Sequence, residues 1–231
     1  MKFLDLFSGI GGFRLALEHL GHEAVGFVEI DKYARKSYEA MYHTEGEWTR
    51  EDITQICDAE WQELRGEVDI ICGGSPCQAF SVAGERRGFE DTRGTLFFDY
   101  VNAIRNIKPK YFIFENVKGM LSHDKGNTIR TILMAFDEVG YALDIDLFNS
   151  KYYGVPQNRE RIYIVGKRKD LVENFEPSIS SNRLKSITDV REWASTSVQL
   201  INLLPTMEGL EVTTKLVDIL EDDVDDKYYM S

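Results

Sequence analysis

The sequence predicts an α/β fold, a doubly wound and mostly parallel sheet with an antiparallel hairpin at one edge. Short apolar runs alternate with stretches of helical periodicity from residue 2 to residue 148, which places helices on both faces of a parallel sheet. A glycine-rich turn separates the first run from the first helical stretch, as in a strand-turn-helix unit that approaches a ligand. The runs at 141–148 and 161–165 are consecutive strands with no helical stretch between them, so we expect them to form the hairpin around the loop at 149–158.

The strands are expected where β-branched and aromatic residues gather between glycine, proline or polar breaks. These runs fall at residues 2–7, 24–28, 68–72, 110–114, 141–148 and 161–165, with a further strand near Trp48. The run at 68–72 is closed by Gly73 and Gly74, which is typical of a strand interior followed by a turn that lies close to a ligand.

The helices are expected where apolar residues recur at helical spacing. These stretches fall at residues 13–20, 31–41, 92–107 and 127–139. Gly21 and Gly140 follow two of them, and Asp31 stands near the start of another, so their ends carry ordinary helix signals. From residue 171 onward the pattern weakens to a loop at 174–183 and short helices at 188–194 and 216–220.

Length and composition are typical of one globular core, with 231 residues of which 43% are hydrophobic. We find no signal peptide and no apolar run of about 18 residues, so we expect a cytoplasmic protein without a membrane partner. The three cysteines, Cys57, Cys72 and Cys77, form neither an even disulfide set nor a metal-ligand cluster. We therefore expect a reducing compartment and no metal.

The charge opposes nucleic-acid binding, because a formal net charge of −12 and a pI near 4.9 are the reverse of a basic footprint. Half of this excess lies in residues 201–231, where eight acidic residues face two lysines for a net charge of −6. Basic side chains occur elsewhere in the chain, at Arg86, Arg87, Arg93, Arg159, Arg161 and the run at 167–169. They are interpreted either as solvated surface groups or as contacts to a substrate.

Two features of the sequence indicate a ligand site at the carboxyl ends of the strands. A turn at residues 8–12 brings backbone N–H groups toward a ligand, and Glu29 ends the second strand, where an acid binds ribose hydroxyls. The glycine spacing matches neither the dinucleotide fingerprint nor a P-loop, and tight packing is the alternative. Cys77 follows Pro76 after the strand at 68–72, which places a thiol where it can attack a substrate. A lone cysteine is more often a buried apolar residue.

The motifs stand together in one order along the chain. They are Asp-Leu-Phe-Ser-Gly-Ile-Gly-Gly at 5–12, Glu29, Asp-Ile at 52–53, Gly-Ser-Pro-Cys-Gln at 74–78, Glu-Asn-Val at 115–117 and Gln-Asn-Arg-Glu-Arg at 157–161. The set resembles the cytosine-C5 methyltransferases that use S-adenosylmethionine, over nearly the whole chain. The resemblance implies their Rossmann-like fold, DNA methylation and a link to restriction-modification systems, with a catalytic and cofactor-binding domain at residues 1–170. No target-recognition region and no late Gly-Asn-Ser/Ala-Val motif follows Gly166, so we expect residues 171–231 to be an extension leading toward such a region.

The resemblance implies a role for each catalytic residue. Cys77 would add as a thiolate to C6 of a flipped cytosine, and a protonated Glu115 would donate a proton toward N3 and the exocyclic amine. Arg161, with Arg159, would stabilise the charge that develops near O2. Asn116 is expected to brace the loop that carries Cys77.

The resemblance also implies a set of residues around S-adenosylmethionine and its product S-adenosylhomocysteine. The set is Phe7, Gly9, Gly11, Glu29, Ile30, Asp52, Ile53, Gly74, Pro76 and Leu96. Glu29 would bind the ribose hydroxyls and Asp52 the adenine amine. For Phe7, Ile53 and Leu96, packing in the core is the alternative.

Three functions stay open from the sequence. The first is methylation of cytosine in double-stranded DNA, with the recognition region supplied by a second chain or a restored C-terminal part. The second is methylation of RNA on the same scaffold, which is disfavoured because the Cys-Phe-Thr signature of the tRNA-modifying branch is missing. The third is a catalytic subunit or fragment that is inactive alone. We expect the chain to fold but to bind duplex DNA negligibly by itself.

Overall fold

The computed structural model describes residues 1–76, 96–173, 185–205 and 209–221. The expected loop at 174–183, the start of the helix expected at 92–107, and Cys77 with the three arginines at 86, 87 and 93 lie outside these ranges.

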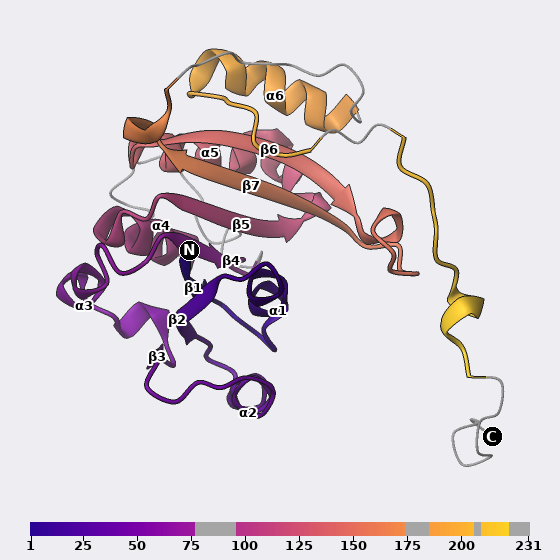
Figure 1. The fold of residues 1–231 in the computed structure, drawn as a ribbon. Helices are drawn as coiled ribbons and strands as arrows, with labels where there is room; N and C mark the ends of the chain where they lie inside the picture. Colours follow the sequence, from indigo (N-terminus) through magenta and orange to yellow (C-terminus); the bar gives the residue numbers. More distant parts are fainter. Residues whose placement is uncertain (77–95, 174–184, 206–208, 222–231) are drawn as a thin grey trace.

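The described strands form one seven-stranded sheet in the order β3-β2-β1-β4-β5-β7-β6 (Figure 1). Their bounds are β1 (Lys2–Leu6), β2 (Glu23–Val28), β3 (Trp48–Arg50), β4 (Ile70–Gly73), β5 (Tyr111–Val117), β6 (Tyr141–Asn149) and β7 (Glu160–Arg168). The strands from β3 to β5 in this order pair in parallel, and β7 runs antiparallel to β5 and to β6. The mostly parallel sheet and the antiparallel hairpin at one edge are confirmed.

The helices divide between the two faces of the sheet, as expected for a doubly wound fold. Their bounds are α1 (Gly12–His19), α2 (Lys32–Met41), α3 (Asp58–Glu63), α4 (Leu96–Ile107), α5 (Asn127–Glu138) and α6 (Lys185–Ser197). On one face, Leu17 of α1 packs with Phe3 and Cys72, and the ring of Tyr38 in α2 stacks on Phe27 with centroids 4.2 Å apart.

The other face carries the main core, which α3, α4 and α5 cover. Trp61, Tyr100 and Phe136 from these helices are each at most 1% exposed and belong to one apolar cluster with Leu4 and Ile71 of the sheet. The alternation of the strands explains this division, because successive side chains point to opposite faces.

The segment after α6 covers the β6 edge of the sheet. Leu143 N donates to Gln199 O at 2.8 Å, and Ile201 N donates to Leu143 O at 2.7 Å, so residues 199–201 pair with an otherwise open strand edge. The helix α6 lies next to α5, with the Arg130 guanidinium 5.5 Å from the ring centroid of Trp193. The part of the C-terminal extension at 185–205 thus packs on the sheet, whereas residues 209–221 run away from it (Figure 1).

Three expectations about the elements need correction. Glu115 lies inside β5 and not after its end, because antiparallel pairing with β7 continues to Val117 while the parallel partner β4 stops at Gly73, opposite Phe114. The helix expected at 188–194 is longer and covers all of α6 (Lys185–Ser197). The helical spacing of apolar residues is weak in this stretch and did not mark the ends of the helix. The helix α3 was not expected, since at six residues it is shorter than the window over which periodicity is informative.

Candidate active site

The turns after β1, β2 and β4 meet at one edge of the sheet, because these strands are parallel. Phe7 begins the first turn with φ 55°, a left-handed conformation that costs energy for a residue with a side chain. Gly9 and Gly11 follow with φ 55° and 89°. A Cβ on Gly11 would lie 2.4 Å from the Tyr42 ring, whereas one on Gly9 would meet nothing within 4 Å. The turn is therefore packed at Gly11 and open at Gly9.

Glu29 connects the first two turns through its carboxylate. One oxygen, Oε2, accepts the N–H of Gly9 at 2.8 Å, and Oε1 accepts the N–H of Asp31 at 2.8 Å. Asp31 in turn caps α2 by accepting the N–H groups of Tyr33 and Ala34. Each carboxylate oxygen of Glu29 keeps acceptor capacity for a ligand, because a carboxylate accepts about four hydrogen bonds in all.

The other residues expected around the cofactor differ in exposure. Asp52 caps a 3-10 helix at Ile53–Gln55 by accepting the N–H and hydroxyl of Thr54. Ile53 is 4% exposed and lies in the main core, so the structure shows it packing in the core, the alternative to a cofactor contact. Ile30 is 70% exposed, and Phe7 and Leu96 are partly buried against the main core.

The turn after β4 lies directly against Glu115. Gly73 has φ 152°, and a Cβ there would lie 2.0 Å from Leu6 O. A Cβ on Gly74 would lie 2.5 Å from the Glu115 carbonyl oxygen and 2.9 Å from Oε2 of its carboxyl group. Neither position has room for a side chain, which explains the glycine pair. The Asn116 amide donates to Ser75 O at 2.9 Å, a contact expected of a residue that braces the segment leading to Cys77.

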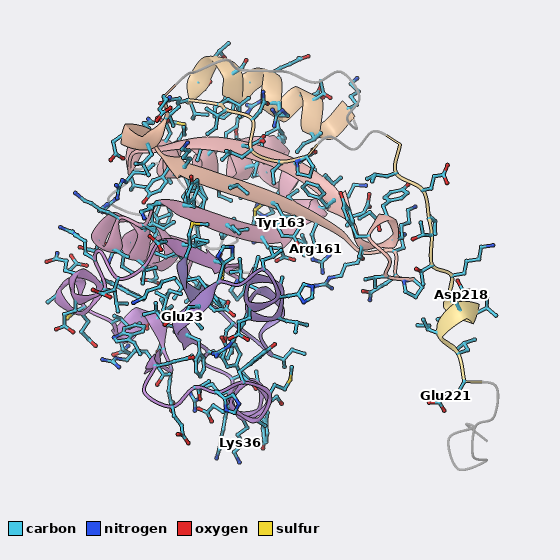
Figure 2. All side chains as sticks on the ribbon, in the orientation of Figure 1. Glu23, Lys36, Arg161, Tyr163, Asp218 and Glu221 are labelled. Carbon is cyan, nitrogen blue, oxygen red and sulfur yellow. The ribbon has the colours of Figure 1, made fainter. Side chains whose placement is uncertain are left out.

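Glu115 and Arg161 form the central pair of the site. Arg161 Nε lies 2.9 Å from Glu115 Oε1, and the two side chains are 21% and 24% exposed. Burial raises the pKa of Glu115, and the charges of Arg161 and Arg159 oppose this rise without cancelling it. Glu115 is therefore protonated more readily than an exposed glutamate, as the sequence predicts. Figure 2 shows Arg161 and Tyr163 on β7; Tyr163 faces the same side as Arg161.

Sequence reasoning missed a buried acid beneath the first turn. Asp5 is fully buried in β1, where Cys72 Sγ lies 3.7 Å from Oδ1 and the Tyr38 hydroxyl donates to Oδ2 at 3.4 Å. Burial raises the pKa of Asp5 to about 8, because these weak donors only partly offset desolvation. The signal in the sequence was a single acid inside an apolar run.

A hollow lies beside α1 and the segment 41–47. It has a volume of about 710 Å³ and is lined by residues near the amino ends of β1 and β2, among them Lys2, Arg14 and Glu23. Arg14 is ion-paired there with Glu18 and Glu47, so its charge serves the fold. Tyr42 also lines this hollow and donates its hydroxyl to Gly11 O at 2.9 Å, so the hollow borders the residue that packs against the first glycine turn.

The described residues lack two kinds of feature. They contain no group of three or more His, Cys, Asp or Glu side chains arranged to hold a metal ion. They also contain no helix that is long and apolar enough to cross a membrane.

Comparison with known proteins agrees with the motifs. A family model described as C-5 cytosine-specific DNA methylase matches residues 1–231. The chain is 46% identical over 234 residues to the orphan methyltransferase M.SPRI of Bacillus phage SPR, covering 100% of this chain and 52% of that protein. It is 47% identical over 193 residues to the type II methyltransferase M.HpaII of Haemophilus parainfluenzae, covering 82% of this chain and 52% of that protein. The chain thus spans about half the length of these relatives.

Solved structures show the same architecture. A variant of Spodoptera frugiperda DNMT2 superposes with a TM-score of 0.67 at 26% identity, over 98% of this chain and 61% of that one. The Dnmt2 methyltransferase of S. pombe superposes with a TM-score of 0.63 at 22% identity, over 100% of this chain and 62% of that one, and supports the fold alone. With its motifs in order on this sheet, the chain belongs to the C-5 cytosine-specific DNA methylase family.

Proposed function

We propose that the chain is the catalytic part of a DNA cytosine-C5 methyltransferase that uses S-adenosylmethionine. The observation that carries the proposal is the close approach of the Gly74 turn to Glu115, with Arg161 on the other side of the same carboxyl group. The turn leads to Cys77 three residues later. We propose that this turn directs Cys77, which lies outside the described residues, toward the same base as the proton donor Glu115 and the cation Arg161.

The residues at the turns fit S-adenosylmethionine. Gly9 leaves open space beside the backbone, and Glu29 offers acceptor capacity beside it. Among the described side chains, the hydroxyls of Ser8 and Ser75 are buried without a hydrogen-bond partner, at 8% and 3% exposure of their residues. Orphaned polar atoms are uncommon in folded proteins and favour a missing ligand partner here. When bound, the cofactor supplies an electrophilic methyl group.

The proposed chemistry begins on the cytosine. C5 is a weak nucleophile in an aromatic ring, and addition of the Cys77 thiolate at C6 breaks that aromaticity. Glu115 then gives its proton toward N3, and burial, which raises its pKa, favours the protonated form that this step needs. Arg161 holds the Glu115 carboxyl in place and, together with Arg159, stabilises charge near O2. After methylation a base removes the C5 proton and the thiol is eliminated.

The acceptor is proposed to be duplex DNA with the target cytosine flipped out of the stack, at a cost of a few kcal/mol. The net charge of −12 opposes binding to phosphates, so we propose that recognition needs further polypeptide, in cis or as a second chain. RNA is the alternative acceptor.

Transfer of labelled methyl groups tests the proposal, with duplex DNA and tRNA as competing acceptors and the C-terminal half of a relative added in trans. DNA should be methylated and tRNA should not. Cys77→Ser should bind S-adenosylmethionine as the parent does and should transfer no methyl, because a hydroxyl is ionised far less than a thiol. DNA carrying 5-fluorocytosine should trap the parent and not the variant. Full activity of the Ser variant would refute the covalent route, and tRNA labelling would refute the choice of acceptor.

A further inference from the structure

The two arginines of the site follow a long hairpin loop. Residues 150–159 connect β6 to β7, and Arg159 is the last residue of this loop. Loops of this length are mobile unless their ends are fixed. Arg161 lies two residues after Arg159 and contacts Glu115. The position of its guanidinium beside Glu115 therefore depends on how the loop is closed.

Asn149, at the end of β6, closes the loop with both ends of its side-chain amide. Its Oδ1 accepts the N–H of Lys151 at 3.3 Å and the N–H of Arg159 at 3.2 Å. Its Nδ2 donates to Asn158 Oδ1 at 2.7 Å. Asn149 is 7% exposed, so these contacts are shielded from competing water.

Ser150 adds a second connection across the loop base. Its N–H donates to Arg159 O at 3.1 Å, and its hydroxyl donates to Gln157 O at 3.0 Å. The backbone of Arg159 is thus held at both its N–H and its carbonyl group. The next residues pair in the sheet, Asn149 with Glu160 and Phe148 with Arg161.

We propose that Asn149 is a positioning residue, whose side-chain amide fixes the end of the hairpin loop and thereby holds Arg159 and Arg161 at the flank of Glu115. The chemical purpose of this arrangement rests on the proposed function, but the arrangement itself does not. An asparagine suits the position because it offers an acceptor and a donor on one short side chain. Aspartate would lose the donor to Asn158, and alanine would lose all three contacts.

The test measures the titration of Glu115 in the 231-residue chain by carbon-13 NMR of its side-chain carboxyl, assigned with Glu115→Gln. The groups that face this carboxyl are Arg161, Arg159 and Tyr163. In Asn149→Ala the arginines should move away, so Glu115 should titrate at a higher pH than in the parent. The affinity for S-adenosylmethionine, measured by calorimetry, should stay unchanged. The glycine turn proposed to bind it follows β1, and Asn149 makes none of its contacts there.

Asn106→Ala is the matched control. Asn106 is 6% exposed, accepts from Gln62 and donates to Asp58 between α3 and α4, so it is as buried and as bonded as Asn149 but remote from Glu115. Both variants should lower the melting temperature, and only Asn149→Ala should move the Glu115 titration. Equal titration of Glu115 in the parent and in Asn149→Ala would overturn the proposal and leave Asn149 a structural residue.

Asn158→Ala keeps the proposal testable if Asn149→Ala does not fold. It removes only the exposed partner of Asn149 Nδ2, and Glu115 should again titrate at a higher pH, by less. An unchanged Glu115 titration in Asn158→Ala would contradict the positioning role of Asn149. A chain that transfers no methyl group under any condition would refute the proposed function, whereas the Glu115 titration would still decide the role of Asn149.

Discussion

Asp5 in one half of the sheet and Asp144 in the other are both fully buried, but their hydrogen-bond and charge partners differ. In the parallel half, β3-β2-β1-β4, Asp5 meets the weak donors Cys72 and Tyr38 and the backbone and charge of Arg14, and burial still raises its pKa to about 8. In the antiparallel half, β5-β7-β6, Asp144 meets the Arg191 guanidinium and accepts the N–H groups of Leu203 and Leu204 at 2.7 Å. The partner, rather than burial alone, decides whether a buried carboxyl group is held neutral or charged.

The difference follows from what each half does in the fold. Arg191 reaches Asp144 from α6 and also donates to Ile145 O, so the ion pair attaches the chain after residue 185 to the sheet edge. Asp5 instead lies two residues before Phe7, beneath the turn proposed to hold the cofactor. The Asp144 contact thus anchors a segment of chain, whereas Asp5 lies within the packed strand that leads into the first turn.

The largest expected effect comes from removing one partner of the buried ion pair. Arg191→Ala should lower the free energy of unfolding by about 3–5 kcal/mol, because Asp144 would be left buried with only backbone donors. Denaturant unfolding measures this. Arg130→Ala, which removes an exposed arginine from the contact between α5 and α6, should cost below about 1 kcal/mol. Similar losses in both variants would mean that packing of α6, and not the ion pair, anchors the segment.

A second prediction concerns the pH dependence of Asp5. Its folded pKa of about 8 is above the ordinary value of 3.8, so the stability that its protonated form contributes is complete below about pH 4 and is lost as pH rises through 8. Asp5→Asn cannot ionise, so its unfolding free energy should exceed that of the parent by several kcal/mol at pH 8 and by little at pH 4. Glu63→Gln, on the exposed side of α3, should show no such divergence. Parallel pH profiles for parent and Asp5→Asn would mean that Asp5 is ionised in the fold.

Sequence patterns predicted the parallel half better than the antiparallel half, for a physical reason. The glycine turn, Glu29 and the Gly73-Gly74 pair are local signals, since a short stretch of chain dictates each conformation. The Arg161–Glu115 contact joins residues of two strands, and the chain order alone does not give their register. Asp144 and Arg191 are 47 residues apart and look like ordinary surface charges in the sequence.

The motif resemblance supplied roles where local patterns did not. It marked Glu115, Arg159 and Arg161 as one group before their positions were known, and the structure brings them together electrostatically. It gave no role to Asn149 or to Asp5, the first residue of the motif at 5–12, because their contacts are hydrogen bonds that form only in the folded chain. Ile53 is likewise buried because α4 packs near the 3-10 helix that contains it, a contact between segments far apart in the sequence.

The third prediction tests the ligand role of the parallel half. Glu29→Ala should weaken binding of S-adenosylmethionine by about 1–3 kcal/mol, because the ribose hydroxyls would lose an acceptor and the Gly9 turn would lose its support. Calorimetry on the 231-residue chain measures the change. Glu23→Ala, at the opposite end of the same strand, should bind as the parent does (Figure 2). An unchanged affinity in Glu29→Ala would leave Glu29 a purely structural link between the two turns.

The smallest effect is expected from an exposed ion pair in the antiparallel half. Lys118 Nζ lies 2.9 Å from Glu160 Oε2, but the side chains are 47% and 32% exposed. Water screens such a pair, so a double-mutant cycle with Lys118→Ala and Glu160→Ala should give a coupling of about 0.2–0.5 kcal/mol, falling further in high salt. The distance is as short as the Arg161–Glu115 contact, so geometry alone would predict equal strength. A coupling near that of the buried Asp144–Arg191 pair would show that burial is not what separates strong from weak ion pairs in this half of the sheet.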